Sequence, residues 1–325
     1  MQFPRLKALA LAAAVILQLL PAAHAEQAWP DRPVRLVVPY SPGGTTDYAA
    51  RQIAQKLTEQ TGKSFIVENK AGGSGTIGTL DIVRSAPDGG NFLIDDTTYA
   101  MLPTQFAKLP WNINEDLVQV TDIIQTPVVL IVPSSSPFKR LQDLVAYAKA
   151  HPGKLNFGSG GQGSSTHLAG ELFKSVAGVD VAHIPYRGAG AALADVMSGQ
   201  IDMLITAAPT ALPPVAGGRV RALAISGSET LAGLPGVPTF AQAGVAPYDV
   251  VNWFGLAAPK GTPPAIVSQL HAQVQRALAD PKLRQALAEQ GARPGGMEPA
   301  KFGEFVKSEL VFWDRVAKDA RIQPQ

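Results

Sequence analysis

The sequence predicts a mixed α/β fold of two lobes joined by two crossing strands. From residue 34 onward, short apolar strands alternate with amphipathic helices, the pattern of a mainly parallel sheet covered by helices on both faces. Two apolar strands divide that series: residues 122–133 (DIIQTPVVLIVP), interrupted by Pro127, and residues 250–257 (VVNWFGLA). A first domain that the chain leaves and re-enters through such strands has the topology of a hinge-bending protein.

Apolar spacing marks each element of the first lobe. Residues 34–39 form a buried strand, and in the helix that follows Ala49, Ile53 and Leu57 recur at i, i+4 and i+8, so that they can face the sheet. Further along, residues 65–68 are expected to form a strand, 76–85 a helix and 91–97 a strand. Turns rich in Gly and Pro, at 69–73 and 86–90, separate them.

The second lobe repeats this alternation after the first crossing strand. Its expected elements are, in order, a helix (141–150), a strand (154–158), a helix (166–177), a strand (180–186), a helix (189–198) and strands at 201–206 and 220–226. After the return crossing, helices at 263–280, 281–290 and 299–319 pack back onto the first lobe, with a core stripe of Leu270, Val274 and Leu278. Domain 1 is therefore predicted to comprise residues 26–122 and 250–325, and the inserted domain 2 residues 123–249.

The first 25 residues are typical of a secretory signal peptide. They contain a basic start (Arg5 and Lys7), an apolar run at 8–20 and the small-x-small cleavage pattern Ala23-His24-Ala25. The apolar run is shorter than the roughly 20 residues that a membrane-spanning helix needs. We therefore expect export and cleavage after Ala25.

Composition excludes several classes of function. Without Arg5 and Lys7 the 28 basic side chains become 26, which equals the 26 acidic ones, so the exported chain has no net charge to attract nucleic acid. The chain contains no cysteine. Disulfides, thiolate catalysis and thiolate metal sites are thereby excluded.

A strand that runs into a glycine-rich turn and then a hydroxyl-capped helix occurs twice. The two segments are 35–57 (RLVVPYSPGGTTDYAARQIAQKL) and 154–173 (KLNFGSGGQGSSTHLAGELF). Each would direct free backbone N–H groups and the positive end of a helix dipole at one point, as an anion site requires. Two such segments indicate two lobes that close on one small anion.

The first loop offers both backbone and hydroxyl donors. Its glycines permit a tight turn and a close approach of backbone to ligand, its threonines add hydroxyls and a helix cap, and its acidic residue suits the helix dipole. The candidate ligand-binding residues here are Tyr40, Pro42, Gly43, Gly44, Thr45, Thr46 and Asp47. The alternative is an ordinary strand-to-helix turn that binds nothing.

The second loop is richer in donors than a structural turn needs. Four hydroxyls and several amides unobstructed by side chains fall within eight residues, so its candidates are Ser159, Gly160, Gly163, Ser164, Ser165 and Thr166. His167 follows directly. It either contacts the ligand or bonds to a neighbouring backbone group.

Other candidates stand near the ends of later strands. Tyr186 and Arg187 stand at the end of the strand at 180–186. Arg187 is the one cation in these loops, and its side chain either contacts the ligand or is a solvated or interlobe residue. Thr206 and Ala207 lie at the carboxyl end of the strand at 201–206, where clefts form in such sheets. Asp202 is also a candidate, but its place at the start of that strand favours a structural role.

The strand that begins at Asn91 ends in Asp95-Asp96-Thr97-Thr98, if it is extended to residue 98. Thr97 and Thr98 are candidates for ligand contact. A carboxylate of Asp95 or Asp96 in the cleft would repel a simple anion and favour a ligand that also carries an amine or another donor. The alternative is a solvated pair. Elsewhere, Trp253 either walls the pocket or fills a core.

The order of motifs resembles the extracytoplasmic receptors of tripartite tricarboxylate transporters, the Bug receptor family. The resemblance covers essentially the whole exported chain and is carried by WPDRPVRLVVPYSPGGTTD (29–47), VENKAGGSGTIG (67–78), FGSGGQGSSTHLAGELF (157–173), VAHIPYRGAGAALADVMSGQIDM (181–203), LPGVPTFAQAG (234–244) and WFGLAAPKGTPPAIVSQL (253–270). Asp202 matches an acidic position of the family. At Asp95 and Asp96 the chain departs from it, because the family usually has small and hydroxyl residues there.

The resemblance implies a periplasmic binding protein with a Venus flytrap, type II-like fold. Such a receptor binds a small carboxylate or a similar solute and delivers it to a membrane permease. The resemblance also implies that backbone N–H groups, hydroxyls and water capture the carboxylate without an arginine clamp. We expect a monomer.

An enzyme is the competing class. Two glycine patterns, Gly73-x-Gly75-x-x-Gly78 and Gly158-x-Gly160-x-x-Gly163, fit a dinucleotide fingerprint, but an exported protein lacks a supply of nicotinamide cofactor. The chain has no GxSxG, HExxH or complete P-loop, and the histidines at 151, 167, 183 and 271 are too dispersed for a metal site local in sequence. We therefore expect no catalysis, cofactor or metal. A further alternative keeps the binding protein but replaces the permease with a signalling partner.

Overall fold

The computed structural model describes residues 29–319 and residue 324. The predicted signal peptide and its cleavage site after Ala25 lie outside the described residues. Among those that are described, no helix is long and apolar enough to cross a membrane.

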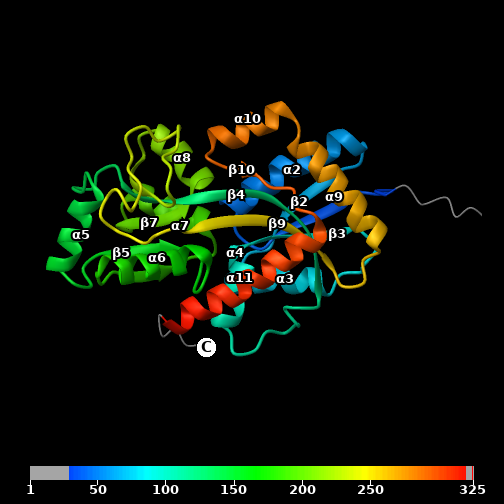
Figure 1. Cartoon of the computed structure of the whole chain (residues 1–325), viewed down its shortest axis with the longest axis horizontal. Helices are drawn as coiled ribbons and strands as arrows, with labels where there is room; N and C mark the ends of the chain where they lie inside the picture. Colours follow the sequence, from blue (N-terminus) through cyan, green and yellow to red (C-terminus); the bar gives the residue numbers. More distant parts are fainter. Residues whose placement is uncertain (1–28, 320–323, 325) are drawn as a thin grey trace, which may run out of the picture.

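A ten-stranded sheet runs through both lobes, with helices on both of its faces (Figure 1). Its order is β2-β1-β3-β9-β4-β7-β5-β6, and β8 and β10 also pair with β4. The strands are β1 (Val34–Val38), β2 (Phe65–Asn69), β3 (Asn91–Asp96), β4 (Leu117–Pro133), β5 (Asn156–Ser159), β6 (Ala182–Pro185), β7 (Met203–Ala207), β8 (Val220–Ile225), β9 (Val251–Pro259) and β10 (Arg293–Pro294). The mixed α/β class predicted from the sequence is confirmed.

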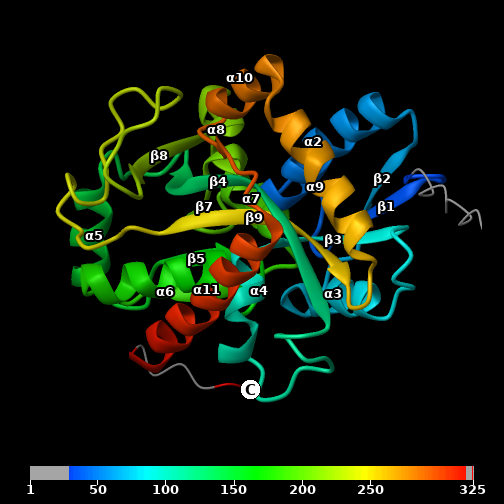
Figure 2. The same cartoon turned by 45° about the vertical axis from the view of Figure 1, so that its right-hand side comes forward.

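The helices follow the expected alternation. They are α2 (Thr45–Thr61), α3 (Thr76–Val83), α4 (Thr97–Met101), α5 (Leu141–Ala150), α6 (Ser165–Ala177), α7 (Ala189–Ser198), α8 (Ala208–Ala216), α9 (Pro264–Leu278), α10 (Pro281–Glu289) and α11 (Pro299–Asp319), with single 3₁₀ turns η1 (Gly73–Gly75) and η2 (Leu102–Thr104). The C-terminal helices return to the first lobe, where α9 packs beside α2 and α11 crosses β4 and lies against α4 (Figure 2).

Two long antiparallel strands, β4 and β9, connect the lobes. They pair from Leu117 opposite Pro259 to Pro127 opposite Val251. Beyond Pro127, β4 pairs with β7 and β8 of the second lobe. The proline therefore stands where the strand changes partners, a place at which a residue without a backbone N–H is tolerated.

Two helices were not expected from the sequence. Thr97 and Thr98 begin α4 and do not continue β3, because Asp96 turns the chain: its Oδ1 accepts a hydrogen bond of 2.8 Å from the Thr98 N–H and caps the helix. Helix α8 follows β7 directly, with Pro209 in its first turn, where the missing N–H costs nothing. The extension of the strand to Thr98 was therefore wrong.

The cores lie on both faces of the sheet. Both predicted stripes, residues 49, 53 and 57 and residues 270, 274 and 278, are buried in the cluster between α2, α9 and the first-lobe strands. On the opposite face Trp253 packs edge to face on Phe302 and Phe305, with ring centroids 5.5 and 5.9 Å apart. Trp253 therefore fills a core and does not wall the cleft.

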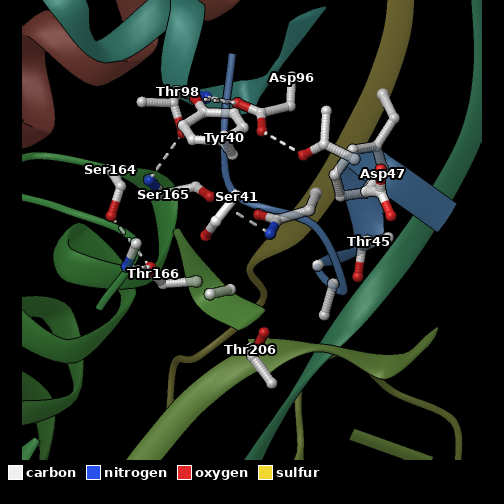
Figure 3. Close-up of a pocket in the computed structure, with 17 residues that line it drawn as sticks. Tyr40, Ser41, Thr45, Asp47, Asp96, Thr98, Ser164, Ser165, Thr166 and Thr206 are labelled. Carbon is white, nitrogen blue, oxygen red and sulfur yellow. Dashed lines mark hydrogen bonds between the residues drawn. The ribbon is translucent and has the colours of Figure 1, made fainter. Parts of the chain in front are cut away.

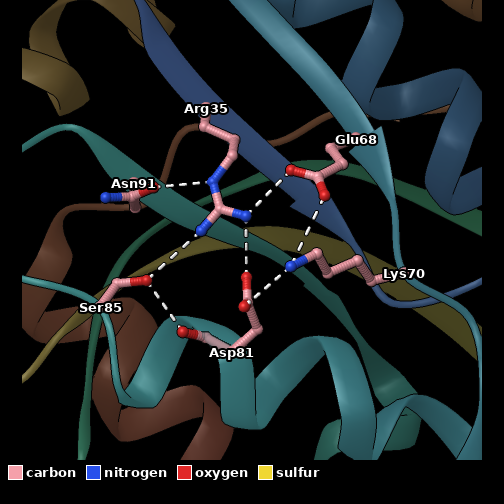
Figure 4. A network of polar contacts seen from close by, with 6 residues as sticks. All are labelled: Arg35, Glu68, Lys70, Asp81, Ser85 and Asn91. Carbon is pink, nitrogen blue, oxygen red and sulfur yellow. Dashed lines mark hydrogen bonds and ion pairs between the residues drawn. The ribbon is translucent and has the colours of Figure 1, made fainter.

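A charge network joins β1, β2 and α3 (Figure 4). Arg35 donates to Glu68 at 2.9 Å and forms an ion pair with Asp81 at 2.8 Å, and Lys70 pairs with Asp81 at 2.8 Å. The Arg35 side chain is 28% exposed. Its Nε also donates to Asn91 of β3 at 2.8 Å, so that one guanidinium ties three strands and a helix together.

Candidate functional site

Four strand-to-helix junctions meet in a cleft between the lobes: β1–α2 and β3–α4 from the first lobe, and β5–α6 and β7–α8 from the second (Figure 3). The cleft is partly open to solvent, and its cavity volume is about 40 Å³. The predicted residues that line it are Tyr40, Gly44, Thr45, Thr46, Asp47, Thr98, Gly160, Ser164, Ser165, Thr166, Thr206 and Ala207.

Helix α2 presents an uncapped N-terminus to the cleft. Its N-cap residue is Gly44, which has no side chain to accept a hydrogen bond. Within the described chain, the backbone N–H groups of Gly44, Thr45, Thr46 and Asp47 have no acceptor. These donors and the helix dipole together make an anion site.

Asp47 does not cancel that site, because its charge is already paired. Arg51 donates to it twice, at 3.0 and 2.9 Å, and Asn69 donates at 3.0 Å. Burial opposes ionisation of Asp47, but the hydrogen bonds from Arg51, Asn69 and the Gly43 N–H outweigh it and lower the pKa of this carboxyl.

The second loop uses most of its own amides, contrary to expectation. The Gly160 N–H donates to Thr166 Oγ1 at 2.7 Å, the Gly163 N–H to His167 Nδ1 at 2.8 Å, and the Ser165 N–H to Thr98 Oγ1 at 3.0 Å. What this loop offers the cleft is chiefly hydroxyl groups, with Ser164 Oγ and Thr166 Oγ1 3.0 Å apart. Amide donors for an anion therefore come mainly from the first lobe.

Several predicted residues lie outside the cleft. They are Pro42, Gly43, Thr97, Ser159, Gly163, His167, Tyr186, Arg187 and Asp202. Thr97 Oγ1 accepts from the Trp253 N–H at 2.9 Å, and Ser159 Oγ lies 2.6 Å from His183 Nε2. Asp202 accepts from the Asn156 N–H at 2.8 Å, a contact within the second lobe.

His167 bonds to a neighbouring backbone group, the Gly163 N–H, which is one of the two alternatives given by the sequence. Its ring stacks on His183 with centroids 3.8 Å apart. Burial, and secondly the neighbouring His183, lower the pKa of His167 to about 3, so this ring is neutral and carries no charge for an anion.

Tyr186 and Arg187 serve contacts beside the cleft. The Tyr186 hydroxyl donates to Asp195 at 2.7 Å, and the backbone carbonyl of Arg187 accepts from the Ser41 N–H at 3.3 Å. The Arg187 side chain is exposed. The guanidinium of Arg187 is therefore solvated, one of the alternatives held, and only its backbone reaches the other lobe.

The two lobes are in direct contact around the cleft. Thr45 and Thr210 hydroxyls lie 2.7 Å apart across it. At Gly190 the approach is closer still, because a Cβ there would lie 2.4 Å from the Pro42 carbonyl oxygen. The lobes are therefore closed on one another in this structure, with backbone close to backbone at Gly190.

The two acidic residues of β3 lie on opposite faces of the sheet. Asp96 lines the cleft and accepts from the hydroxyls of Tyr40 at 3.1 Å and Thr46 at 2.9 Å, in addition to the Thr98 N–H (Figure 3). Asp95 lies on the α11 face, where a Cβ on Gly255 would meet both its Oδ1 and the Phe302 ring.

Neither carboxyl belongs to a solvated pair, because Asp95 is 1% and Asp96 6% exposed. Burial raises the pKa of Asp96 above its ordinary value, against the hydrogen bonds that it accepts. Burial, with the charge of Asp96 second, raises the pKa of Asp95 well above its ordinary value.

Four lining residues were not predicted from the sequence: Ser41, Ala189, Asn252 and Phe254. Asp96, for which the sequence left two alternatives, lines the cleft as well. Asn252 and Phe254 alternate with the core residue Trp253 along β9, so the alternation of a strand was the signal that could have found them. Among the described residues, no group of three or more His, Asp or Glu side chains is arranged to hold a metal ion.

Comparison with known proteins gives consistent matches along the chain. A model described as the tripartite tricarboxylate transporter family receptor matches residues 49–322. Protein BugT of Bordetella pertussis is 34% identical over 293 residues, which make up 90% of this chain and 90% of that protein.

Solved structures match the fold as well. The periplasmic binding protein BugD superposes with a TM-score of 0.88 at 29% identity, covering 91% of this chain and 100% of that one. An R. palustris protein with adipate has a TM-score of 0.88 at 36% identity, over 91% and 100% of the two chains. MatC from Rhodopseudomonas palustris, with bound malate, has a TM-score of 0.84 at 32% identity, over 89% and 100%. The expected periplasmic binding protein fold is confirmed.

Proposed function

The chain belongs to the tripartite tricarboxylate transporter receptor family, a family of periplasmic solute-binding receptors and not of enzymes, and from this premise we propose that it captures a small carboxylate between its lobes. The observation that supports this most directly is the uncapped N-terminus of α2, whose free amides face the hydroxyls of the second lobe across the cleft. The relatives with adipate and malate support the same ligand class.

The carboxylate would be held by charge-assisted hydrogen bonds. Each bond to a charged group contributes about 1.5–3 kcal/mol, and the helix dipole adds to them without any cationic side chain. Because the ligand then touches donors on both lobes, it favours the closed shape over an open one. In this proposal residues 26–122 with 250–325 and residues 123–249 are the two moving bodies, and β4 and β9 contain the hinge.

The partner in this proposal is a membrane permease of the tripartite type, which recognises the closed shape. The family description supports a transport partner over a signalling partner. We further propose that the exported chain acts as a monomer, without nucleic acid, and begins at Glu26. The intact mass of protein isolated from periplasm tests the last point.

A pair of substitutions at Thr45 tests the anion site. Proline is well accommodated at the first position of a helix and would remove the free N–H, whereas Thr45→Val removes only the hydroxyl that meets Thr210. We expect Thr45→Pro to bind carboxylates about 10- to 150-fold more weakly than Thr45→Val, as the loss of about 1.5–3 kcal/mol implies. Titration calorimetry with succinate, glutarate, adipate and malate, and with their amino counterparts, measures this. Equal affinity in the two variants would remove the α2 N-terminus from the site.

A further inference from the structure

The cleft has an acceptor end as well as a donor end. Asp96 and Asn252 both line it, and the side-chain carbonyl oxygen of Asn252 is buried without a hydrogen-bond partner. No Lys or Arg is among the described residues that line the cleft. Resting on the proposed function, we infer that the ligand is a zwitterion, a carboxylate that also carries an ammonium group, and that Asp96 selects it.

The two acceptors share one face of the sheet. Asp96 of β3 lies opposite Phe254 in the antiparallel register with β9, and Asn252 lies two residues from Phe254 on β9. Because side chains alternate along a strand, Asn252, Phe254 and Asp96 project on the same side, with Asn252 and Asp96 as diagonal neighbours. Both can therefore accept from a single group in the cleft.

The donors around Asp96 are neutral groups. They are the hydroxyls of Tyr40 and Thr46 and the N–H of Thr98, with the Thr98 hydroxyl also beside the carboxyl. None of them brings a positive charge to Asp96. An ammonium group carries that charge and three N–H donors, so it can displace a neutral donor from Asp96 and donate to Asn252 at the same time.

The charge of Asp96 also argues against a plain organic anion. The cleft supplies no cation to pair with Asp96, because no Lys or Arg is among its described lining residues and Arg51 is bound to Asp47. A dicarboxylate would place its second negative charge against a buried carboxylate and an unpartnered carbonyl oxygen. A ligand ammonium would instead be attracted to the Asp96 carboxylate and could donate to the Asn252 carbonyl oxygen.

The donor end and the acceptor end of the cleft lie close together. Thr46 contributes a free backbone N–H to the donor end, and its hydroxyl donates to Asp96 at the acceptor end. One residue therefore bridges the two ends. This arrangement favours an amino group close to the captured carboxylate, as in an α- or β-amino acid, over one at the far end of a long chain.

Matched ligand pairs test the inference. We would measure thermal shift and titration calorimetry at pH 7.5 with L-aspartate against succinate, L-glutamate against glutarate, L-alanine against propionate and β-alanine against propionate. At least one amine-bearing member should bind 10-fold or more tightly than its partner. Asp96→Asn, which keeps the shape and still accepts from the Thr98 N–H, should reduce that preference at least 10-fold.

Asp95→Asn is the matched control. It makes the same chemical change one residue away, on the face of the sheet that does not meet the cleft, and should leave the preference unchanged. If the acids without an amine bind as tightly as or more tightly than their partners, the zwitterion inference is overturned and the carboxylate receptor stands. If no member of any pair binds, both are overturned.

Discussion

Adding one methyl group at Gly190 should make closure of the lobes less favourable. Gly190 lies in the first turn of α7, and a Cβ there would be 2.4 Å from the Pro42 carbonyl oxygen, 3.1 Å from the Gly43 carbonyl carbon and 3.2 Å from the Gly44 N. All three atoms are backbone of the opposite lobe. They cannot rotate away as the end of a side chain would.

The expected loss of ligand affinity follows from the state of the protein in which the clash occurs. Overpacking of this kind costs about 1–3 kcal/mol, and it is present only when the lobes are closed. The separated lobes should not suffer, because alanine is favoured over glycine in a helix by about 1 kcal/mol. The ligand must therefore supply the extra cost of closure, so its affinity should fall about 5- to 150-fold in Gly190→Ala.

Calorimetry with the acid that stabilises the wild type most would measure this loss, and small-angle scattering would show whether the variant still contracts on binding. Gly303→Ala is the control, because Gly303 lies in α11 and its Cβ would have no neighbour within 4 Å. Affinity for Gly190→Ala within twofold of wild type, with the same contraction, would show that binding does not require the closed contact described here.

Two stability predictions follow from the buried and networked charges. The pKa of Asp95 is raised in the folded chain, so above about pH 4 folded Asp95 holds a proton that the unfolded chain has released. The free energy of unfolding should therefore fall as pH rises, by up to about 1.4 kcal/mol per pH unit. The fall should end once Asp95 ionises in the folded state as well. Urea unfolding of Asp95→Asn should remove this slope, and an identical slope in both proteins would contradict the assignment. Arg35→Met should cost about 2 kcal/mol, because Glu68 and Asp81 lose their shared cation, whereas Arg32→Met, in an exposed single pair, should cost clearly less; equal losses in thermal unfolding would argue against the network.

The sequence determined the elements that depend on neighbouring residues. The apolar stripe at Ala49, Ile53 and Leu57 and the Gly-rich turns before α2 and α6 were predictable, because helical period and turn chemistry are local properties. The start of α4 was missed although its signal is also local. The side chain of Asp96 accepts from the Thr98 N–H and so starts α4 at a point where the strand had been expected to continue.

The site itself was only partly accessible from the sequence. Twelve of its lining residues come from the two glycine-rich loops and the strand ends that were singled out. The loss of free amides in the second loop was not predictable, because it depends on where hydroxyls such as Thr98 Oγ1 and Thr166 Oγ1 point after folding. Thr98 belongs to the other lobe, so only the closed structure brings it to the Ser165 N–H.

Tertiary structure alone decided the character of the acceptor end. Asp95 and Asp96 are adjacent and chemically identical, yet one faces the α11 core and the other the cleft, according to the pleat of β3 beside β9. Asn252 joins Asp96 although the two residues are far apart in the chain. The order of residues fixes which side chains alternate, but only the pairing of distant strands fixes which of the two faces becomes the binding surface.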